Sequence, residues 1–308
     1  MKTDPRFRLR PIFLAGPTAV GKSAVALRLA EQFGGEIISA DSMQVYRGLD
    51  IGTAKPSAAD RARVPHHLID LVDLIESFDV AKFVRLARQA VTEIQSREKT
   101  PIFCGGTGLY FKAYVRGLGE APAANPALRA ELEAMPFEAL LRELRERDPA
   151  AYEKMDKQNP RRVIRAVEVI RLTGRPFSEQ WADWQREGQP ETAEKIFVLT
   201  RRPDDLRERI NARVDEMFRR GLVEETRALL QCGLDRNPTA MQAIGYRQVV
   251  EHLHGRRSLP DTVQLVKQRT RQFAKRQLIW FRRHGNCQWM ELKPDEPLEG
   301  ILPRLNQV

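Results

Sequence analysis

The sequence predicts an α/β protein in which a parallel sheet is flanked by helices and carries an inserted all-helical domain. Three observations support this fold class. Short apolar runs alternate with helical periods between residues 12 and 104, which is the pattern of a parallel sheet covered on both faces. A glycine-rich turn joins the first strand to the first helix, and a long helical stretch separates the third strand from the fourth.

The first third of the chain contains three strands and two helices in alternation. Each strand is a short apolar run, and each helix has apolar residues at intervals of three and four, the period of one buried face. In chain order these elements are Ile12 to Ala15, Ser23 to Gln32, Glu36 to Ala40, Asp79 to Ser96 and Pro101 to Cys104.

The composition changes near residue 121, where APAANP supplies helix breakers and the following residues show helical periods without a strand. We therefore expect a catalytic core formed by residues 1–120 and 191–308 and a helical insertion formed by residues 121–190, in line with about 150 residues for each folded unit. The clearest helix of the insertion begins with Asn159 as N-cap and Pro160 at the first helical position, and it ends before Gly174.

The chain then returns to the sheet with a strand over Lys195 to Thr200. Further helices are expected over Asp204 to Arg219, Leu222 to Cys232 and Asp261 to about Arg283. The last helix carries seven basic residues and no acidic one between positions 267 and 283. Val266, Phe273 and Trp280 recur every seven residues on one face of it, and we expect Trp280 in the core.

Basic residues outnumber acidic ones, 51 to 41, which gives a formal net charge of +10 and a sequence pI near 9.8. This balance favours a polyanionic partner such as nucleic acid. The three cysteines lie far apart, so neither a disulfide framework nor a cysteine zinc site is expected. No apolar run approaches the ~18 residues of a membrane span, and the one near the amino terminus is too short for a signal peptide. We expect a cytoplasmic monomer without a membrane partner.

Residues 16 to 23 read GPTAVGKS, which matches the phosphate-loop pattern G-x-x-x-x-G-K-[ST] between a strand and a helix. In this motif backbone N–H groups converge on phosphate oxygens, the lysine adds a positive charge and the serine hydroxyl binds Mg²⁺. We therefore expect a P-loop NTPase-like fold with a phosphorylated ligand and Mg²⁺ at Ser23. The predicted loop residues are Gly16, Pro17, Thr18, Ala19, Val20, Gly21, Lys22 and Ser23.

Asp41 ends the run EIISAD, the only apolar run that ends in a carboxylate. At the carboxyl end of a strand beside the phosphate loop, it either holds a metal ion or takes a proton. A simple role as a turn cap also fits the residue type. GGTGLY, residues 105–110, ends the third strand in the equivalent position. Its glycines permit close approach of a ligand, or they merely connect a strand to a helix.

Arginines occupy the first turns of the helix that follows Asn159, where the helix dipole disfavours cations. Arg161, Arg162 and Arg165 therefore cost stability unless they meet anions. Phosphate contact is the simplest compensation, and solvated surface charge is the alternative. KRQLIWFRR in the last helix interleaves cations with aromatic residues, as nucleic-acid-binding surfaces do, or it carries a core stripe with a solvated opposite face.

Seven motifs occur in a fixed order over nearly the whole chain. They are GPTAVGKS, ISADSMQVYRGLDIGTAKP, PHHLID, GGTGLYFKA, QNPRRVIRAVEV, IGYRQ and KRQLIWFRR, from Gly16 to about Arg283. Each is weak alone, but the ordered set closely resembles the tRNA dimethylallyltransferases, also called tRNA isopentenyltransferases. The chain ends at Val308 without the zinc-finger extension of the eukaryotic members, so we expect the bacterial type without structural zinc.

The resemblance implies transfer of a five-carbon prenyl group from dimethylallyl pyrophosphate to the exocyclic amine of the adenosine 3′ of the anticodon. It implies that Thr18, Lys22 and Ser23 contact the pyrophosphate, that Arg213 reaches it as well, and that Asp41 takes the proton from the amine. These roles agree with the chemistry, because a delocalised amine is a poor nucleophile and a departing pyrophosphate accumulates charge. Thr18, Asp41 and Arg213 are therefore the expected catalytic residues.

The resemblance also implies that the adenine is flipped into a channel and that the helical insertion grips the tRNA anticodon stem-loop. The channel would be lined by Ser42, Met43, Gln44 and Thr107, and Asp41 would also contact the tRNA. The other positions implied to contact tRNA are Arg129, Arg161, Arg162, Arg165, Ala243, Ile244, Gly245, Tyr246, Arg247, Gln248, Lys275, Arg276, Gln277, Trp280 and Arg282.

Three other functions fit parts of the sequence. In a P-loop small-molecule kinase, ATP would fill the loop and Asp41 would deprotonate a hydroxyl, but such an enzyme gains nothing from a basic last helix. An adenylate isopentenyltransferase would share the loop without needing that helix or the arginines near Asn159. A non-catalytic RNA-binding protein is hard to reconcile with the intact Lys22, Ser23 and Asp41.

Overall fold

The computed structural model describes residues 9–118, 122–179, 195–283, 286–294, 296–297, 300–301 and 304. The chain divides into two compact units. Unit 1 comprises Met1–Tyr114 and Glu194–Val308, and unit 2 comprises Val115–Ala193. The boundaries at 120/121 and 190/191 that the sequence predicts lie outside the described residues.

Unit 1 is built on a parallel sheet, and among the described residues this sheet has six strands in the order β3-β2-β4-β1-β5-β6. All neighbouring strands run parallel. The strands are β1 (Ile12–Ala15), β2 (Glu36–Ala40), β3 (His66–His67), β4 (Pro101–Gly105), β5 (Ile196–Thr200) and β6 (Cys287–Glu291). The predicted α/β class is confirmed, and each of the four predicted strands is present within one residue of its expected bounds.

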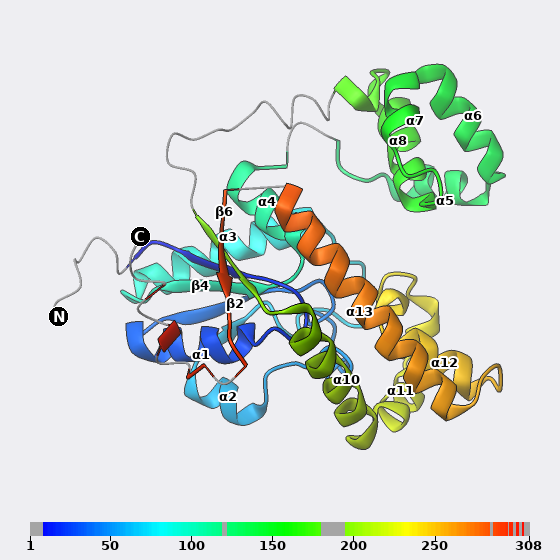
Figure 1. Ribbon diagram of the computed structural model, residues 1–308. Helices are drawn as coiled ribbons and strands as arrows, with labels where there is room; N and C mark the ends of the chain where they lie inside the picture. Colours follow the sequence, from blue (N-terminus) through cyan, green and yellow to red (C-terminus); the bar gives the residue numbers. More distant parts are fainter. Residues whose placement is uncertain are drawn as a thin grey trace. The chain divides into compact units, whose positions relative to one another are not determined.

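Helices cover both faces of this sheet (Figure 1). The helices of unit 1 are α1 (Lys22–Phe33), α2 (Ala58–Arg63), α3 (Val80–Ser96), α4 (Gly108–Arg116), α10 (Pro203–Arg219), α11 (Leu222–Gln231), α12 (Tyr246–Leu253) and α13 (Leu259–Arg283), with short 3-10 turns η2 (Leu234–Arg236) and η3 (Ala240–Gln242). On one face, Leu14 of β1 belongs to a buried cluster with Leu29 of α1 and Ile210 of α10.

The opposite face of the sheet carries an aromatic core. Phe13 of β1 stacks on Phe103 of β4 with ring centroids 4.8 Å apart, and Phe111 of α4 meets the Phe13 ring edge-on at 6.4 Å. Phe83 of α3 stacks on Tyr110 of α4 at 4.0 Å. Alternate residues of β1 therefore face opposite cores, and the sheet is buried on both sides as its apolar strands require.

Two strands were not predicted from the sequence. β3 contains only His66 and His67 and is paired with β2, so it is too short to show any periodicity. β6 is an edge strand beside β5 and presents exposed residues such as Trp289. Its mixed sequence, CQWME, lacks the apolar run that identifies the central strands.

The prediction that Val266, Phe273 and Trp280 form one buried stripe on α13 is wrong. Val266 is buried, but Phe273 is 36% exposed and Trp280 only partly buried. The residues of α13 that are buried are Thr262, Val266, Ala274, Gln277 and Phe281. Their intervals of four, eight, three and four residues follow the true helical period, which drifts away from a strict repeat of seven.

Unit 2 contains helices and loops and no strand among its described residues, and its helices include α5 (Pro126–Ala134), α6 (Phe137–Arg147), α7 (Pro149–Lys154) and α8 (Pro160–Thr173). α8 starts and ends as the sequence predicts. The Asn159 side chain accepts a hydrogen bond from the backbone of Arg162, and Gly174 adopts the left-handed conformation at φ 70°. Leu132, Leu144 and Val167 contribute to a separate apolar core of this unit. In both units, every described helix is too short or too polar to span a bilayer.

Candidate active site

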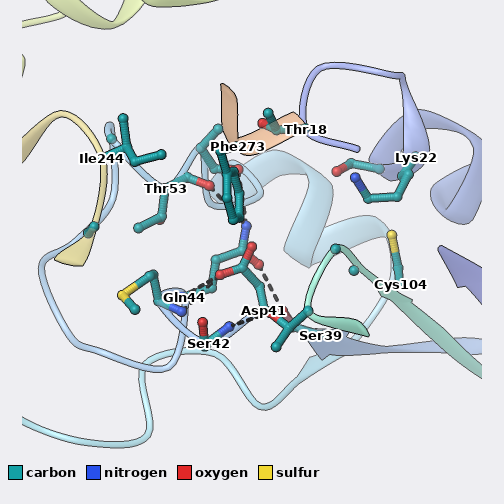
Figure 2. A pocket seen from close by; sticks show the side chains of 18 of the residues that line it. Thr18, Lys22, Ser39, Asp41, Ser42, Gln44, Thr53, Cys104, Ile244 and Phe273 are labelled. Atoms are coloured by element: carbon teal, nitrogen blue, oxygen red, sulfur yellow. Dashed lines mark hydrogen bonds between the residues drawn. The ribbon is translucent and has the colours of Figure 1, made fainter. Parts of the chain in front are cut away.

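The carboxyl ends of β1, β2 and β4 open into one cavity of about 440 Å³. The parallel register places Ala15, Ala40 and Gly105 side by side at these ends. The phosphate loop, Asp41 and Thr107 follow the three strands and line the cavity, as expected at this edge of a parallel sheet. Figure 2 shows Lys22 and Cys104 on one side of Asp41 and Gln44 on the other. The volume suits a small ligand.

Backbone geometry fixes the shape of the phosphate loop. Gly16 has φ 145°, and a Cβ there would lie 2.5 Å from the carbonyl oxygen of Leu199, so only glycine fits. Three loop carbonyls accept hydrogen bonds from cationic side chains. These bonds run from Lys22 Nζ to Pro17 O (2.7 Å), from Arg209 Nε to Ala19 O (3.0 Å) and from Arg201 Nε to Val20 O (2.8 Å). These three carbonyl oxygens are thus already paired with cationic side chains before an anion binds.

Lys22 and Cys104 form the buried end of the cavity. Burial lowers the pKa of Lys22 to about 8, an effect that nearby Arg213 reinforces and that Cys104 and Asp41 oppose. Burial likewise raises the pKa of the Cys104 thiol to about 11. Cys104 is therefore a neutral, weakly polar wall, while Lys22 is a cation held in surroundings that disfavour its charge.

Arg213 enters the same cavity from α10. Its Nε is buried and has no hydrogen-bond partner among the described residues. Burial lowers its pKa, and the charge of Asp41 offsets this effect only in part. A guanidinium with an unpaired buried N–H is costly. Arg213 and Lys22 together therefore favour an anionic ligand between them.

Asp41 is held in one orientation by the backbone that follows it. Its Oδ1 accepts hydrogen bonds from the N–H groups of Met43 (2.8 Å) and Gln44 (3.4 Å). Among the described residues, no hydrogen bond reaches Oδ2. The backbone N–H of Ser42 donates to Thr107 Oγ1 at 3.2 Å, which ties this segment to the loop after β4. The turn-cap role thus uses Oδ1 of the carboxylate and leaves Oδ2 available.

The side-chain amide of Gln44 is fully engaged. Its Oε1 accepts from the hydroxyl of Ser39 at 2.8 Å, and its Nε2 donates to the carbonyls of Thr53 (3.2 Å) and Ala54 (3.4 Å). Figure 2 shows this amide beside Asp41. Gln44 therefore connects β2 to the 53–54 segment and shapes the cavity wall.

The segment 243–248 contains both cavity-lining and buried residues. Ala243 and Ile244 line the cavity. Tyr246 is buried, and its hydroxyl accepts from the Gly52 N–H (3.0 Å) and donates to Glu225 (2.6 Å). Gln248 is also buried and caps α12 through the N–H of Gly245 at 2.8 Å, whereas Arg247 is exposed. The side chains of Tyr246 and Gln248 are thus engaged inside the protein.

The predicted tRNA-contacting residues of α13 also separate into two groups. Lys275, Arg276 and Arg282 are exposed. Gln277 is buried and bonded to the phosphate loop and to Gly106. Trp280 packs on the start of α4 so closely that a Cβ on Gly108 would lie 2.1 Å from the indole. The exposed cations alone are free to meet a large polyanion.

In unit 2, the predicted arginines likewise differ in their surroundings. Arg161 and Arg162 are exposed. Arg129 and Arg165 bond to the fully buried carboxylate of Glu168, at 2.5 and 2.8 Å. Burial alone would raise the pKa of Glu168, but these hydrogen bonds and that of the Asn125 backbone lower it. For Arg165 the compensating anion is therefore inside the protein.

The cavity also contains residues that the sequence analysis did not assign to the site, and Cys104, His66 and Phe273 are among them. Cys104 lies one residue before the end of β4, so the alignment of strand ends could have identified it. His66 lies on the unpredicted β3. Phe273 was assigned to the helix stripe without a role in the site, yet Figure 2 shows its ring directed into the cavity.

Comparison with known proteins gives a consistent result. The family model described as IPP transferase matches residues 44–284. The chain is 45% identical over 295 residues to the tRNA dimethylallyltransferase of Geobacter metallireducens, covering 94% of each chain. It is 44% identical over 290 residues to the tRNA dimethylallyltransferase of Geobacillus thermodenitrificans, covering 92% of this chain and 91% of that one.

Two solved structures resemble the fold. The full-length tRNA isopentenylpyrophosphate transferase of Bacillus halodurans is 39% identical with a TM-score of 0.71, over 97% of this chain and 95% of that one. A eukaryotic dimethylallyltransferase acting on tRNA is 29% identical with a TM-score of 0.75, over 92% of this chain and 73% of that one.

Proposed function

The chain belongs to the IPP transferase family, and from this premise we propose how its cavity performs prenyl transfer to tRNA. The enzyme is a transferase that places a dimethylallyl group from dimethylallyl pyrophosphate on a tRNA. The pyrophosphate rests on the loop that follows β1, and the acceptor is the exocyclic amine of the adenosine 3′ of the anticodon. Asp41 lies between these two substrates.

The observation that carries this proposal is the pair of buried cations. Lys22 and Arg213 line one cavity and both have pKa values lowered by burial, and the Nε of Arg213 has no partner among the described residues. A diphosphate would supply the missing acceptor and restore the full charge of Lys22. The neutral thiol of Cys104 on the adjacent wall suits a ligand that is partly apolar.

Proton removal is assigned to Asp41. Its Oδ1 is held by two backbone N–H groups, which leaves Oδ2 to accept a proton from the substrate amine. In the transfer step, the amine nitrogen bonds to the allylic carbon and the carbon–oxygen bond to diphosphate breaks. The electron pair leaves with the diphosphate, and the amine proton moves to Asp41. The charge on the departing diphosphate is stabilised by Lys22 and Arg213.

Mg²⁺ fits the residues of the cavity. Ser23 and Asp41 provide oxygen donors in it, and the described residues contain no cluster of three or more His, Cys, Asp or Glu that could enclose an ion. Mg²⁺ commonly binds through few protein oxygens together with phosphate oxygens and water. Ser23 and the diphosphate would hold it, and the ion would supply charge neutralisation.

The tRNA is assigned to exposed cations of both units. Lys275, Arg276 and Arg282 on α13, and Arg161 and Arg162 on α8, are exposed. Contacts of such residues with phosphates position a nucleic acid without reading its sequence. We assign the anticodon stem-loop to these residues and the flipped adenine to the cavity wall formed by Ser42, Met43, Gln44 and Thr107.

Mass spectrometry of the RNA distinguishes this function from the alternatives. The protein is incubated with Mg²⁺ and an unmodified anticodon stem-loop, together with either dimethylallyl pyrophosphate or ATP. We expect the RNA to gain the mass of one dimethylallyl group with the allylic diphosphate only. Prenylation of free AMP but not of the stem-loop would indicate an adenylate isopentenyltransferase, and ATP turnover would indicate a kinase.

A further inference from the structure

Phe273 is an aromatic residue that lies outside the hydrophobic core. It lies on α13 directly before Ala274 and one turn before Gln277, which are both buried, but is itself 36% exposed. Its ring lines the cavity and points into it from the side opposite the 39–44 segment (Figure 2). A large aromatic side chain placed outside the core and inside a ligand cavity is typical of a binding contact.

The surroundings of the ring suit a flat, polar aromatic ligand. Thr53, Ile244 and Met43 line the same cavity, so apolar groups and hydrogen-bonding groups are both within it. The guanidinium of Arg276 lies 5.8 Å from the centroid of the Phe273 ring. Stacked arrays of bases, aromatic rings and arginine planes recur where proteins hold unpaired nucleotides.

We propose that Phe273 is the stacking platform of the flipped adenine and so holds the base in place for Asp41. The proposal rests on the proposed function, because it needs a base in the cavity. It adds a substrate contact from α13 to those already assigned to the wall formed by Ser42, Met43, Gln44 and Thr107.

A contact between Phe273 and the allylic group is the competing role. The developing positive charge on the allylic carbon requires a site that water cannot reach, whereas the Phe273 ring is more than a third exposed. Arg276 also places a positive charge near the ring, which disfavours a second cation there. The buried end of the cavity, beside Lys22 and Cys104, is better suited to the diphosphate and its reacting carbon.

The test compares three variants with the wild type. Phe273→Leu keeps the apolar volume but removes the π face, and Phe273→Trp keeps a π face. Leu259→Ala is the matched control, because Leu259 is 41% exposed on the same helix and does not line the cavity. Melting temperatures of all variants establish that each is folded.

The first readout is steady-state kinetics with an unmodified anticodon stem-loop. For Phe273→Leu we expect kcat/KM for the stem-loop to fall by about 5- to 150-fold, the range of one lost base–aromatic stack, with KM for dimethylallyl pyrophosphate unchanged. Phe273→Trp should restore most of the activity, and Leu259→Ala should match the wild type.

The second readout needs no catalysis. A stem-loop carrying 2-aminopurine at the target position lacks the reactive amine but binds the enzyme, and stacking on indole quenches its fluorescence. Quenching with Phe273→Trp, and its absence with Phe273→Leu, supports the proposal. Wild-type kinetics in Phe273→Leu, or a raised KM for dimethylallyl pyrophosphate alone, overturns it. A wild-type enzyme that does not prenylate the stem-loop overturns the proposed function itself and this inference with it.

Discussion

Gln277 accepts a hydrogen bond from the backbone N–H of Thr18 at 2.9 Å, although 259 residues separate the two in the chain. Its Nε2 donates to the carbonyl of Gly106 at 3.0 Å. One buried amide on α13 thus ties the phosphate loop to the loop after β4. Because Gln277 engages the Thr18 N–H, the proposed contact of Thr18 with the diphosphate falls to its hydroxyl.

Loss of this amide should weaken diphosphate binding. Gln277→Met removes both hydrogen bonds and keeps a similar side-chain volume. The buried groups left without a partner cost roughly 1–2 kcal/mol. We therefore expect KM for dimethylallyl pyrophosphate to rise about tenfold. Gln277→Glu should be worse, because it adds a negative charge beside the loop. Gln272→Glu, an exposed position of the same helix, is the control. Equal KM values for all four proteins would contradict the assignment.

Asp41→Asn should abolish transfer without preventing binding. Asparagine keeps an oxygen to accept from the N–H groups of Met43 and Gln44 but cannot take a proton. We expect kcat to fall by about 10²- to 10⁴-fold, the range for a lost general base, with unchanged Kd values for tRNA and dimethylallyl pyrophosphate. Single-turnover kinetics and filter binding measure these quantities. Normal turnover at saturating tRNA would exclude Asp41 as the base.

Arg213→Met should slow catalysis and stabilise the free protein. Loss of one donor to the leaving group costs about 3 kcal/mol of barrier, or roughly 10²- to 10³-fold in kcat. The free protein no longer buries a guanidinium with an unpaired Nε, so its melting temperature should rise. Thermal melts without ligand and single-turnover rates test both effects. A lower melting temperature would show that Arg213 supports the fold.

The pKa of Lys22, about 8 in the free protein, predicts how binding depends on pH. Above pH 8 the free amine loses its proton, so affinity for diphosphate should fall about tenfold for each further pH unit. Binding near pH 8 should take up a proton, because the anion favours the charged amine. Calorimetry in buffers of different ionisation enthalpy measures this uptake. Lys22→Arg should abolish it, and uptake that persists in Lys22→Arg would point to another group.

The lowered pKa of Lys22 affects stability in the opposite direction to binding: the free energy of unfolding rises with pH, whereas the affinity for diphosphate falls. The pKa of Lys22 in the folded protein, about 8, lies below the ordinary lysine value of 10.5, so the unfolded chain binds more protons between these pH values. The contribution of Lys22 to the free energy of unfolding therefore rises with pH across this window. Denaturant titrations of the wild type and Lys22→Met at pH 8 and pH 10 should show this gain in the wild type only.

Charge reversal on α13 should weaken tRNA binding in a salt-dependent way. Lys275→Glu and Arg282→Glu each remove one exposed cation. If each meets a phosphate, the slope of log K against log salt should flatten by about one unit per variant. Arg85→Glu on α3, an exposed cation elsewhere on unit 1, makes the same change of net charge and is the control. Identical slopes would place the tRNA on another surface.

Local patterns were enough to predict the central part of the fold. β1, β2, β4 and β5 are apolar runs buried on both faces, and α8 has a complete pair of end signals in Asn159 and Gly174. β3 and β6 depend on pairing with neighbours distant in the chain, for which short segments of mixed composition carry no local signal. Propensity alone therefore cannot locate them.

The sequence predicted those parts of the site that directly follow the ends of strands. The phosphate loop and Asp41 are recognisable because their chemistry is encoded within a few residues. Other features of the site depend on which face of a helix is packed against the rest of the protein. These features are the inward direction of Gln277, the position of the Phe273 ring in the cavity and the pairing of Arg165 with Glu168. That choice is made by the tertiary structure, and basic residues on a helix look alike in sequence whether they bind tRNA or a buried carboxylate.

The pairing of β6 with β5 and the reach of α13 to the phosphate loop have a consequence for biosynthesis. Thr18 of the loop is translated 259 residues before Gln277, whose amide ties the loop, and β6 follows later still. A nascent chain therefore exposes a glycine-rich segment without these supporting partners until α13 and β6 have been made. Premature termination before α13 yields fragments that lack the Gln277 amide and leave the loop without this support, and such fragments would be natural targets for proteolysis.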